Sequence, residues 1–314
     1  MNAFTNTLRQ SFIQMSSPAK LMLLLILVLF FMILGSAIAV LLAIPLYDLD
    51  LASLYRLIEN PDENNIGIIK FFQIVQSVFL FIIPALLAAW LFSKNSFDYL
   101  QAGKGASVIT LAMVLSSLFL AVPLMNAVTM LNSKLDLPDW MNGLENTVKS
   151  MEENAARLTE LFLESNSMSD LAVNFLMIAI LPALGEEFLF RGVIQRLFSD
   201  WTRNKHMGVI LAAFLFSFIH FQFYGFIPRF LLGLYFGYLL VWSSSIWVPV
   251  AGHLINNGMA VIYYHFSKKP VGDTIMDKIG TGQDGHYPLY LSVFFTAILI
   301  GIIYLHEKKS RISG

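Results

Sequence analysis

Long apolar stretches separated by short polar segments run through almost the whole chain. A helix needs about 20 apolar residues to cross a membrane, so the pattern predicts eight candidate spans. These cover residues 21–47, 70–93, 107–131, 170–198, 207–224, 229–245, 246–265 and 287–306. Pro228 and Arg229 interrupt the boundary between the fifth and sixth spans, and the serines at 243–245 predict a tight turn before the seventh. We therefore expect an all-α, polytopic membrane helix bundle with about eight transmembrane helices.

The segment between the third and fourth spans has a different periodicity. Its apolar residues recur at alternating steps of four and three, which places them on one stripe of a helix. They are Leu144, Val148, Met151, Ala155, Leu158 and Phe162. The pattern predicts an amphipathic helix over about 144–164, and two arrangements fit it: a helix resting on the outer surface of the bundle, or a lid or partner-docking helix. We divide the chain into a three-span region with this helix, residues 1–169, and a membrane core, residues 170–314.

The distribution of basic residues predicts the orientation. Four segments that fall on one side of an eight-span bundle carry Arg9, Lys20, Lys94, Lys104, Arg196, Arg203, Lys205, Lys308, Lys309 and Arg311. Cytoplasmic loops of membrane proteins hold an excess of Lys and Arg, so both termini are predicted to be cytoplasmic. The first apolar run is too long for the apolar part of a signal peptide and indicates a retained span. The compact loops, without targeting motifs, favour the cytoplasmic (inner) membrane of a bacterium.

Composition agrees with a membrane protein and excludes several kinds of site. The chain is 57% hydrophobic and 13% charged, with a mean hydropathy of +0.67, whereas a soluble domain is about a quarter charged. Membrane lipid is therefore an expected partner. The net charge of −1 gives no indication of nucleic-acid binding. The chain has no cysteine, which excludes disulfides, thiolate metal sites and a cysteine nucleophile.

Strongly polar residues inside the predicted spans gather in the second half of the chain. A charge at membrane depth is costly unless it is paired or faces water, so such residues are functional candidates. From spans four, five and seven they are Glu186, Glu187, Arg191, His220, His253 and Asn257.

Helical spacing separates the roles of these residues. Glu187 and Arg191 are four positions apart, share a helix face and can pair, which lowers the cost of burying both charges. Glu186 lies about 100° further round the helix and has no local cation, which suits a general acid or base. His253 and Asn257 are also four apart, so both project from one face of span seven.

Two kinds of chemistry fit one carboxylate, two imidazoles and one amide. In the first, a carboxylate, with or without a histidine, takes a proton from water, and hydrogen-bond donors stabilise the oxyanion of an acyl intermediate. In the second, two histidines and a glutamate hold zinc with an open water position. The chain contains neither HExxH nor GxSxG. Taken one at a time, the same residues are also typical of structural hydrogen bonding between membrane helices.

Three short motifs within 186–257 resemble those of one family of intramembrane proteases. EExxxR occurs as Glu186–Arg191, FxxxH as Phe216–His220, and HxxxN as His253–Asn257, in this order and on separate predicted spans. The pattern is similar to that of the CPBP family, which includes CAAX prenyl proteases, also called Rce1-like, and bacteriocin-processing enzymes. The resemblance covers roughly residues 170–265.

The resemblance implies a helical bundle whose site opens into a water-filled cavity facing the membrane. It implies that Glu186 and His220 activate the attacking water, and that His253 and Asn257 form the oxyanion hole. Whether the family uses a metal is contested. If zinc takes part, Glu186, His220 and His253 are its expected ligands. An amide is a poor zinc ligand but a natural oxyanion donor, which favours the metal-free alternative.

The implied supporting residues are Glu187, counted among the catalytic set, and Arg191. The expected function is that of an intramembrane endopeptidase that hydrolyses a peptide bond of a membrane-associated protein or peptide. One alternative is a non-catalytic binding or scaffold protein of the same fold, such as a bacteriocin self-immunity protein. Another is a transporter or proton relay, although the one-sided distribution of polar residues differs from the repeats typical of transporters.

Overall fold

The computed structural model describes residues 3–59, 65–135, 138–163, 167–269, 274–282 and 287–313. Within these ranges the chain is helical and contains no strand. The first half contains α1 (Ala3–Gln14), α2 (Ser17–Leu46), α3 (Leu51–Glu59), α4 (Ile66–Ser77), η1 (Val78–Ile82), α5 (Ile83–Phe92), α6 (Ser96–Tyr99), α7 (Val108–Leu120), α8 (Val122–Asn132), η2 (Asp139–Met141) and α9 (Asn142–Leu163). The second half contains α10 (Met168–Asn174), η3 (Phe175–Ile180), α11 (Leu181–Glu186), η4 (Glu187–Ile194), α12 (Gln195–Thr202), α13 (Lys205–Phe218), α14 (Phe226–Ser243), α15 (Trp247–Ser267), α16 (Ile275–Lys278) and α17 (Tyr287–Ser313).

The all-α, polytopic fold is confirmed, whereas the count of eight spans is not. Five helices in the described ranges are long and apolar enough to cross a membrane, or six if the pair α7 and α8, bent by 47°, is one span. These counts leave out α13 and α15. The helix α13 has only 14 residues, and α15 carries the polar residues of the third motif. The apolar pattern of the sequence does not distinguish such helices from full spans. Apolar residues next to a short helix make it look longer, and apolar residues around a polar face conceal that face.

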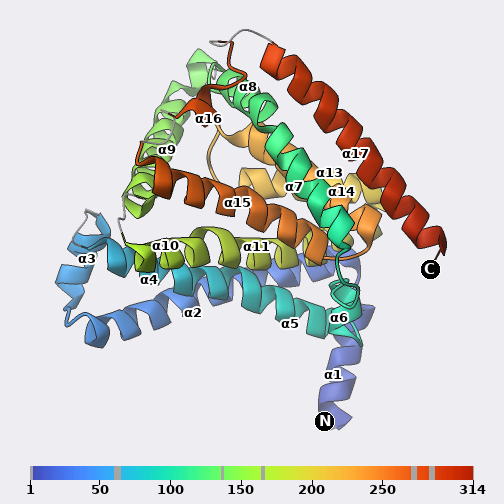
Figure 1. Ribbon diagram of the computed structural model, residues 1–314. Helices are drawn as coiled ribbons and strands as arrows, with labels where there is room; N and C mark the ends of the chain where they lie inside the picture. Colours follow the sequence, from blue (N-terminus) through green and yellow to red (C-terminus); the bar gives the residue numbers. More distant parts are fainter. Residues whose placement is uncertain are drawn as a thin grey trace.

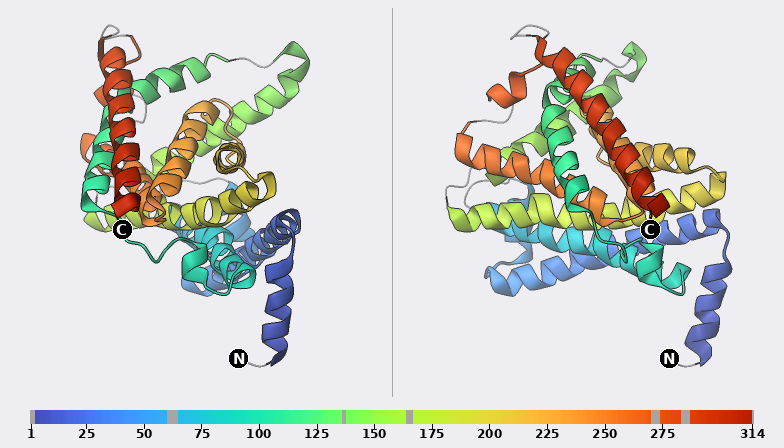
Figure 2. Two further views of the ribbon diagram at one scale, coloured as in Figure 1. Left: turned by 90° about the vertical axis from the view of Figure 1, so that its right-hand side faces the viewer. Right: turned by 45° about the vertical axis from the view of Figure 1, so that its right-hand side comes forward.

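Several helices lie side by side in layers (Figure 1). The helices α2, α11 and α15 are stacked one above another, and α4, η1 and α5 lie between α2 and α11. The helices α7 and α17 pack against each other. The chain termini lie at the same end of the bundle, to the right in Figure 1, which we call the termini side. The opposite end, at which α9 lies, is the α9 side. Figure 2 shows α1 leading away from the bundle at the termini side.

Prolines explain where the long helices change their winding. A proline inside a helix has no N–H and crowds the carbonyl four residues earlier. The π-helical segments η1 and η3 end directly before Ile83-Pro84 and Leu181-Pro182, and the bend between α7 and α8 precedes Pro123. Single π-helical segments inside α-helices occur often at functional sites. Of these breaks, the one at Pro182 leads directly to the motif glutamates.

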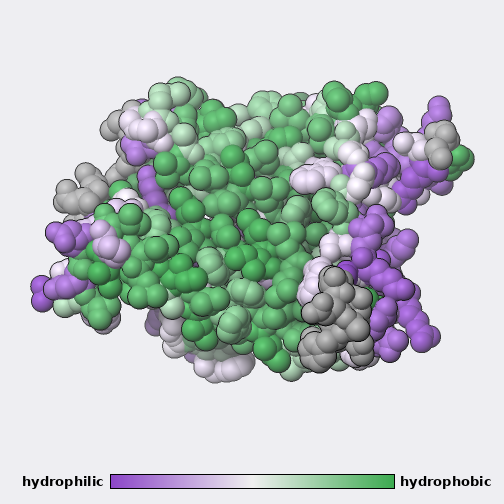
Figure 3. All heavy atoms as spheres, turned by 90° about the horizontal axis from the view of Figure 1, so that it is seen from below, coloured by the Kyte–Doolittle hydropathy of each residue, from purple (hydrophilic) through white to green (hydrophobic). Residues whose placement is uncertain are grey.

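The surface agrees with a membrane environment. Seen from the α2 face, apolar side chains form a broad band, and hydrophilic ones gather at its two ends (Figure 3). Large apolar side chains on α2 are exposed, including Phe30, Ile33 and Leu41. Exposed patches of this size mark a surface that faces lipid or a partner. The apolar helices and this band indicate an integral membrane protein.

The amphipathic segment folds as α9, so the helix predicted over about 144–164 is present, and residue 164 lies outside the described residues. The helix packs against α4, α10 and α15. The proposed boundary at residue 169 stays a prediction. A buried cluster joins side chains from both parts, among them Leu24, Phe92, Leu189 and Phe216.

Candidate active site

A buried ion pair is at the centre of the site. The side chains of Glu187 and Arg191 are 0% and 2% exposed, and Oε1 of the glutamate lies 3.0 Å from Nη1 of the arginine. The four-residue spacing thus corresponds to a contact in the folded protein. Oε2 of Glu187 has no hydrogen-bond partner among the described residues. Charges this deep are tolerated only with close partners.

The arginine of this pair is enclosed by aromatic rings. Its Cζ lies 4.5 Å from the ring centre of Phe216 and 5.7 Å from that of Phe236. A guanidinium over an aromatic face gains cation–π attraction, more so when desolvated. Nη2 also donates to the carbonyl of Gly233 at 3.4 Å. These contacts hold Arg191 in one place against Glu187.

His253 connects the two glutamates. Its Nδ1 donates to Oε1 of Glu187 at 2.8 Å, and its Nε2 lies 3.9 Å from Oε2 of Glu186. The ring stacks on Phe236, with centroids 5.5 Å apart and an interplanar angle of 17°. Because Glu187 takes the Nδ1 hydrogen, the nitrogen directed toward Glu186 is Nε2. The contact of Nδ1 with Glu187 thus determines the tautomer of His253.

His220 lies just beyond the end of α13. Its Nδ1 donates to the carbonyl of Phe216 at 2.6 Å, and the two rings meet edge to face at 5.0 Å. In the neutral form Nε2 is then the unprotonated nitrogen. The next residue, Phe221, has a φ of 50°, so the backbone leaves the helix there. The second motif thus supplies one imidazole whose free nitrogen can accept a proton.

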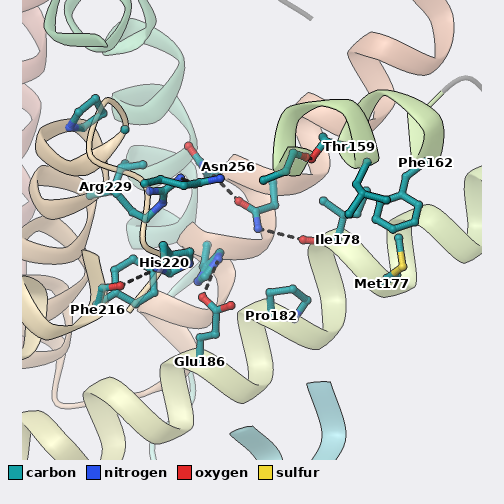
Figure 4. Close-up of a pocket in the computed structure, with 18 of the residues that line it drawn as sticks. Thr159, Phe162, Met177, Ile178, Pro182, Glu186, Phe216, His220, Arg229 and Asn256 are labelled. Atoms are coloured by element: carbon teal, nitrogen blue, oxygen red, sulfur yellow. Dashed lines mark hydrogen bonds and ion pairs between the residues drawn. The ribbon is translucent and has the colours of Figure 1, made fainter. Parts of the chain in front are cut away.

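Residues from all three motifs line one cavity of about 710 Å³. Figure 4 shows the carboxyl group of Glu186 and the ring of His220 directed into it, with Pro182 at its edge. His253 and Asn257 belong to the same lining, and α9 contributes part of the wall. Glu187 and Arg191 lie behind His253. The predicted residues therefore converge, four at the cavity and two as support.

Asn257 has a partner that the sequence does not reveal. Its Nδ2 donates to the carbonyl of Ile178 at 2.9 Å, and its Oδ1 accepts from Nδ2 of Asn256 at 3.1 Å. Ile178 is four residues before Pro182, so its carbonyl lacks the usual N–H donor of an α-helix. An amide nitrogen carries two hydrogens. One serves this carbonyl and the second remains for a ligand.

Residues outside the motifs complete the lining. Arg229 donates to Oε1 of Gln222, and both line the cavity together with Phe236 and Asn256. In the sequence, Arg229 stands out only as an interruption of a span. The rule that singled out Arg191, a charge inside an apolar stretch, applies to it equally. Phe236 has no comparable signal, since one phenylalanine among many on apolar helices does not stand out.

The helix α9 closes the cavity at the end of the bundle opposite the chain termini. Thr159 and Phe162 face it (Figure 4), as do Ala155 and Leu158. The connection after His220 is bound to the same helix, mainly through Tyr224. Its backbone N–H donates to Oε1 of Glu152 at 2.9 Å and its hydroxyl to Oε1 of Glu145 at 3.0 Å. Of the two arrangements predicted for this helix, the contacts favour a cover over the site.

The residues do not form the zinc site considered above. Among the described residues, no group of three His, Cys, Asp or Glu side chains is placed to hold one metal ion. The Nδ1 contacts of His220 and His253 with a carbonyl and with Glu187 leave Nε2 as the free nitrogen of each ring. As placed, Glu186, His220 and His253 do not converge on one point as metal ligands would, and we derive no step through a metal.

Comparison with known protein families finds a match over the central part of the chain. Residues 168–259 match the family model described as type II CAAX prenyl endopeptidase Rce1-like. No curated protein and no solved structure matches the chain. The matched segment runs from α10 into α15 and contains all three motifs, so the motif resemblance is confirmed. This family implies an intramembrane endopeptidase with a membrane-associated peptide substrate. Over residues 168–259, the chain is similar to the type II CAAX prenyl endopeptidases of the Rce1-like family.

Proposed function

We propose that this protein is an intramembrane endopeptidase that hydrolyses a peptide bond of a membrane-associated protein or peptide with an activated water molecule. One observation carries the proposal. Within the family-matched segment, Glu186, His220, His253 and Asn257 line a single cavity among apolar helices. A carboxylate, an imidazole with a free nitrogen and an amide donor are the parts that acyl hydrolysis needs.

In the proposed reaction, Glu186 takes a proton from water, assisted by Nε2 of His220, and the water oxygen attacks the peptide carbonyl. The carbon then carries four substituents and its oxygen is negative. The C–N bond breaks when the leaving nitrogen receives the proton from the acid form of the same base. Positioned acid–base groups of this kind contribute about 10²–10⁴-fold to rate.

The negative oxygen needs donors that are already in place. Asn257 supplies its second amide hydrogen. His253 supplies Nε2–H when the ring is an imidazolium, because its Nδ1 hydrogen goes to Glu187. Glu187 and Arg191 keep that ring in position. The proposal further assigns the termini side, whose polar segments carry ten of the 20 basic residues, to the cytoplasm of a bacterium.

The test is proteolysis in liposomes. Wild type, Glu186→Gln and a control, Glu153→Gln, are offered a library of membrane-anchored peptides with and without a chelator. Glu153 is an exposed acid on α9 outside the cavity lining. We expect cleavage by wild type and by the control, but not by Glu186→Gln, and cleavage that survives the chelator. Loss of cleavage in the presence of the chelator, with recovery when zinc is added, would contradict the metal-free reaction.

A binding measurement separates the protease from a scaffold of the same fold. Peptides that wild type cleaves should bind to Glu186→Gln without being cut, and crosslinking captures them. If the protein is a scaffold, wild type and Glu186→Gln would bind the peptides equally, and neither would cut them. That result, over the whole library, would overturn the proposal.

A further inference from the structure

A second polar cavity lies on the termini side of the buried ion pair. It has a volume of about 190 Å³ and lies among α12, the start of α13 and the ends of α14 and α17. Arg191 lines it, whereas Glu186 and His253 line the larger cavity. The two cavities therefore approach the Glu187–Arg191 pair from opposite ends of the bundle.

The lining of this second cavity carries an excess of positive charge. Arg196, Lys205 and Arg311 come from three different helices, and Asp200 is the acid among them. Arg191 has its own partner in Glu187. Three cations around one carboxylate create a local positive potential that attracts an anion.

Two of the cations are held in position by backbone carbonyls. Arg196 donates from Nη1 to the carbonyl of Tyr99 at 2.6 Å, with its Cζ 4.4 Å from the Tyr99 ring centre. Arg311 donates to the carbonyl of Val241. A guanidinium has five N–H donors in a fixed plane, so one contact orients it and others stay available. Oriented guanidinium groups recognise phosphate through paired hydrogen bonds, and the Ser199 hydroxyl lines the same space.

The level of the cavity in the bundle identifies the source of the phosphate. It lies where α12, α14 and α17 end, beside a group of amphipathic aromatic residues. Trp242 stacks with Tyr238 at 5.5 Å and meets Tyr304 edge to face at 5.7 Å. Such residues mark the headgroup layer of a membrane, and basic pockets between membrane helices bind anionic headgroups. We propose that this cavity binds the phosphate of an anionic phospholipid headgroup.

The test compares two variants that lose the same charge. The cavity variant carries Arg196→Gln, Lys205→Gln and Arg311→Gln. The control carries Lys94→Gln, Lys308→Gln and Lys309→Gln, three exposed lysines at the same end of the bundle. Each protein, in detergent, is titrated with phosphatidylglycerol, with phosphatidylcholine or with inorganic phosphate, and lipid-bound species are counted by native mass spectrometry.

We expect the cavity variant to bind phosphatidylglycerol at least about tenfold more weakly than wild type, and the control to bind it within about twofold. Phosphatidylcholine should bind weakly to all three proteins. Phosphatidylglycerol binding that is weakened equally in both variants would indicate unspecific attraction to the charged surface and would overturn the proposal. Equal competition by inorganic phosphate would overturn the lipid source. If the triple variant does not fold, Lys205→Glu is compared with Lys308→Glu, since both positions are exposed and both changes alter the charge equally. No arm requires proteolysis, so the result is independent of the proposed function.

Discussion

At the scale of single residues, the Glu187–Arg191 pair is a costly feature that the site requires. A buried ion pair adds little net stability compared with apolar residues of similar volume, yet removing one partner leaves a charge buried alone. Glu187 also accepts the Nδ1 hydrogen of His253. Stability and the orientation of the imidazole therefore depend on the same carboxylate.

Glu187→Ala should destabilise the protein by about 3–5 kcal/mol and abolish cleavage, because Arg191 would be buried without its partner. Thermal unfolding in detergent measures the first effect. The double variant Glu187→Met, Arg191→Met is the control, since it removes both charges. It should recover much of the stability while remaining inactive. An unfolding midpoint of Glu187→Ala equal to that of wild type would contradict the role of the pair.

Asn257→Ala should lower turnover about 10²-fold or more with little change in substrate binding, as expected for loss of an oxyanion donor. The same change also removes the donor to the Ile178 carbonyl. Adding Pro182→Ala separates the two roles, because alanine restores a backbone N–H four residues after Ile178. Rescue of turnover in the double variant would show that Asn257 acts only on the helix. We expect stability to recover and turnover to stay low, as measured by single-turnover kinetics.

Sequence spacing was informative where both partners lie on one helix. The interval from Glu187 to Arg191 predicts their contact, because residues four apart share a helix face, and the contact is present although η4 is wound as a π-helix. The contacts of His253 with the glutamates depend on how α15 packs against η4, which no local pattern encodes. For the same reason, the partner of Asn257 could not be predicted, although Pro182 signals that the Ile178 carbonyl needs a donor.

At the scale of elements, close helix contact positions the glutamates. A Cβ atom added at Gly185 would lie 2.8 Å from Cβ of Phe81 in η1, so the two helices meet where only glycine fits. This contact lies next to Glu186 in α11. The approach of η1 therefore fixes the depth of the carboxylate in the bundle.

Gly185→Ala should destabilise the protein by about 1–3 kcal/mol, because Cβ of Phe81 is close to its own backbone and cannot turn away. Gly67→Ala and Gly301→Ala are matched controls, since an added Cβ has no neighbour within 4 Å at either position. In those helices alanine should be neutral or stabilising. Thermal unfolding of the three variants provides the comparison. Equal midpoints for all three would mean that the helix contact is loose.

The contact between α9 and Tyr224 should depend on pH. Burial raises the pKa of the Glu152 carboxyl, opposed by the N–H groups of Tyr224 and Gly225 and the charge of Arg229. The folded protein therefore keeps this proton to a higher pH than the unfolded chain does. The contribution of this group to stability is greatest below the unfolded pKa and falls as pH rises through the raised folded pKa.

Glu152→Gln removes this titration and retains an oxygen acceptor. The unfolding midpoint of wild type minus that of the variant should therefore decrease as pH rises from about 4 to about 8. Glu153→Gln, one position further on the same helix and exposed, is the control that removes an acid without this contact. A constant difference for Glu152→Gln would contradict the assignment.

At the scale of the whole molecule, the direction of successive helices brings the chain ends together. The polar segments at this end carry ten of the 20 lysine and arginine residues of the chain. The apolar pattern predicted the helices of the bundle, and α9, from local periodicity. Short or polar helices such as α13 and α15 were counted as spans because the pattern records how apolar a segment is, not what it packs against.

Cysteine labelling tests the orientation, and the chain, which has no cysteine of its own, gives a clean background. Ser150→Cys places a thiol on α9, and Lys308→Cys places one near the end of α17. In intact cells, a membrane-impermeant maleimide should label the first and leave the second unlabelled until the membrane is opened. The reverse pattern would place the termini outside the cytoplasm.

The two cavities on either side of the Glu187–Arg191 pair have an electrical consequence. Both are lined by polar side chains that can hydrogen-bond water, so the dry layer here is thinner than the ~30 Å hydrocarbon core of a bilayer. A membrane voltage then falls mostly across this layer, where carrying one charge through about 100 mV is worth about 2.3 kcal/mol. Two opposite charges enclosed by phenylalanine rings form a neutral plug at that point. In the proposed reaction, the pair that holds His253 would therefore also separate the water of the larger cavity from the termini side and keep the membrane sealed to ions.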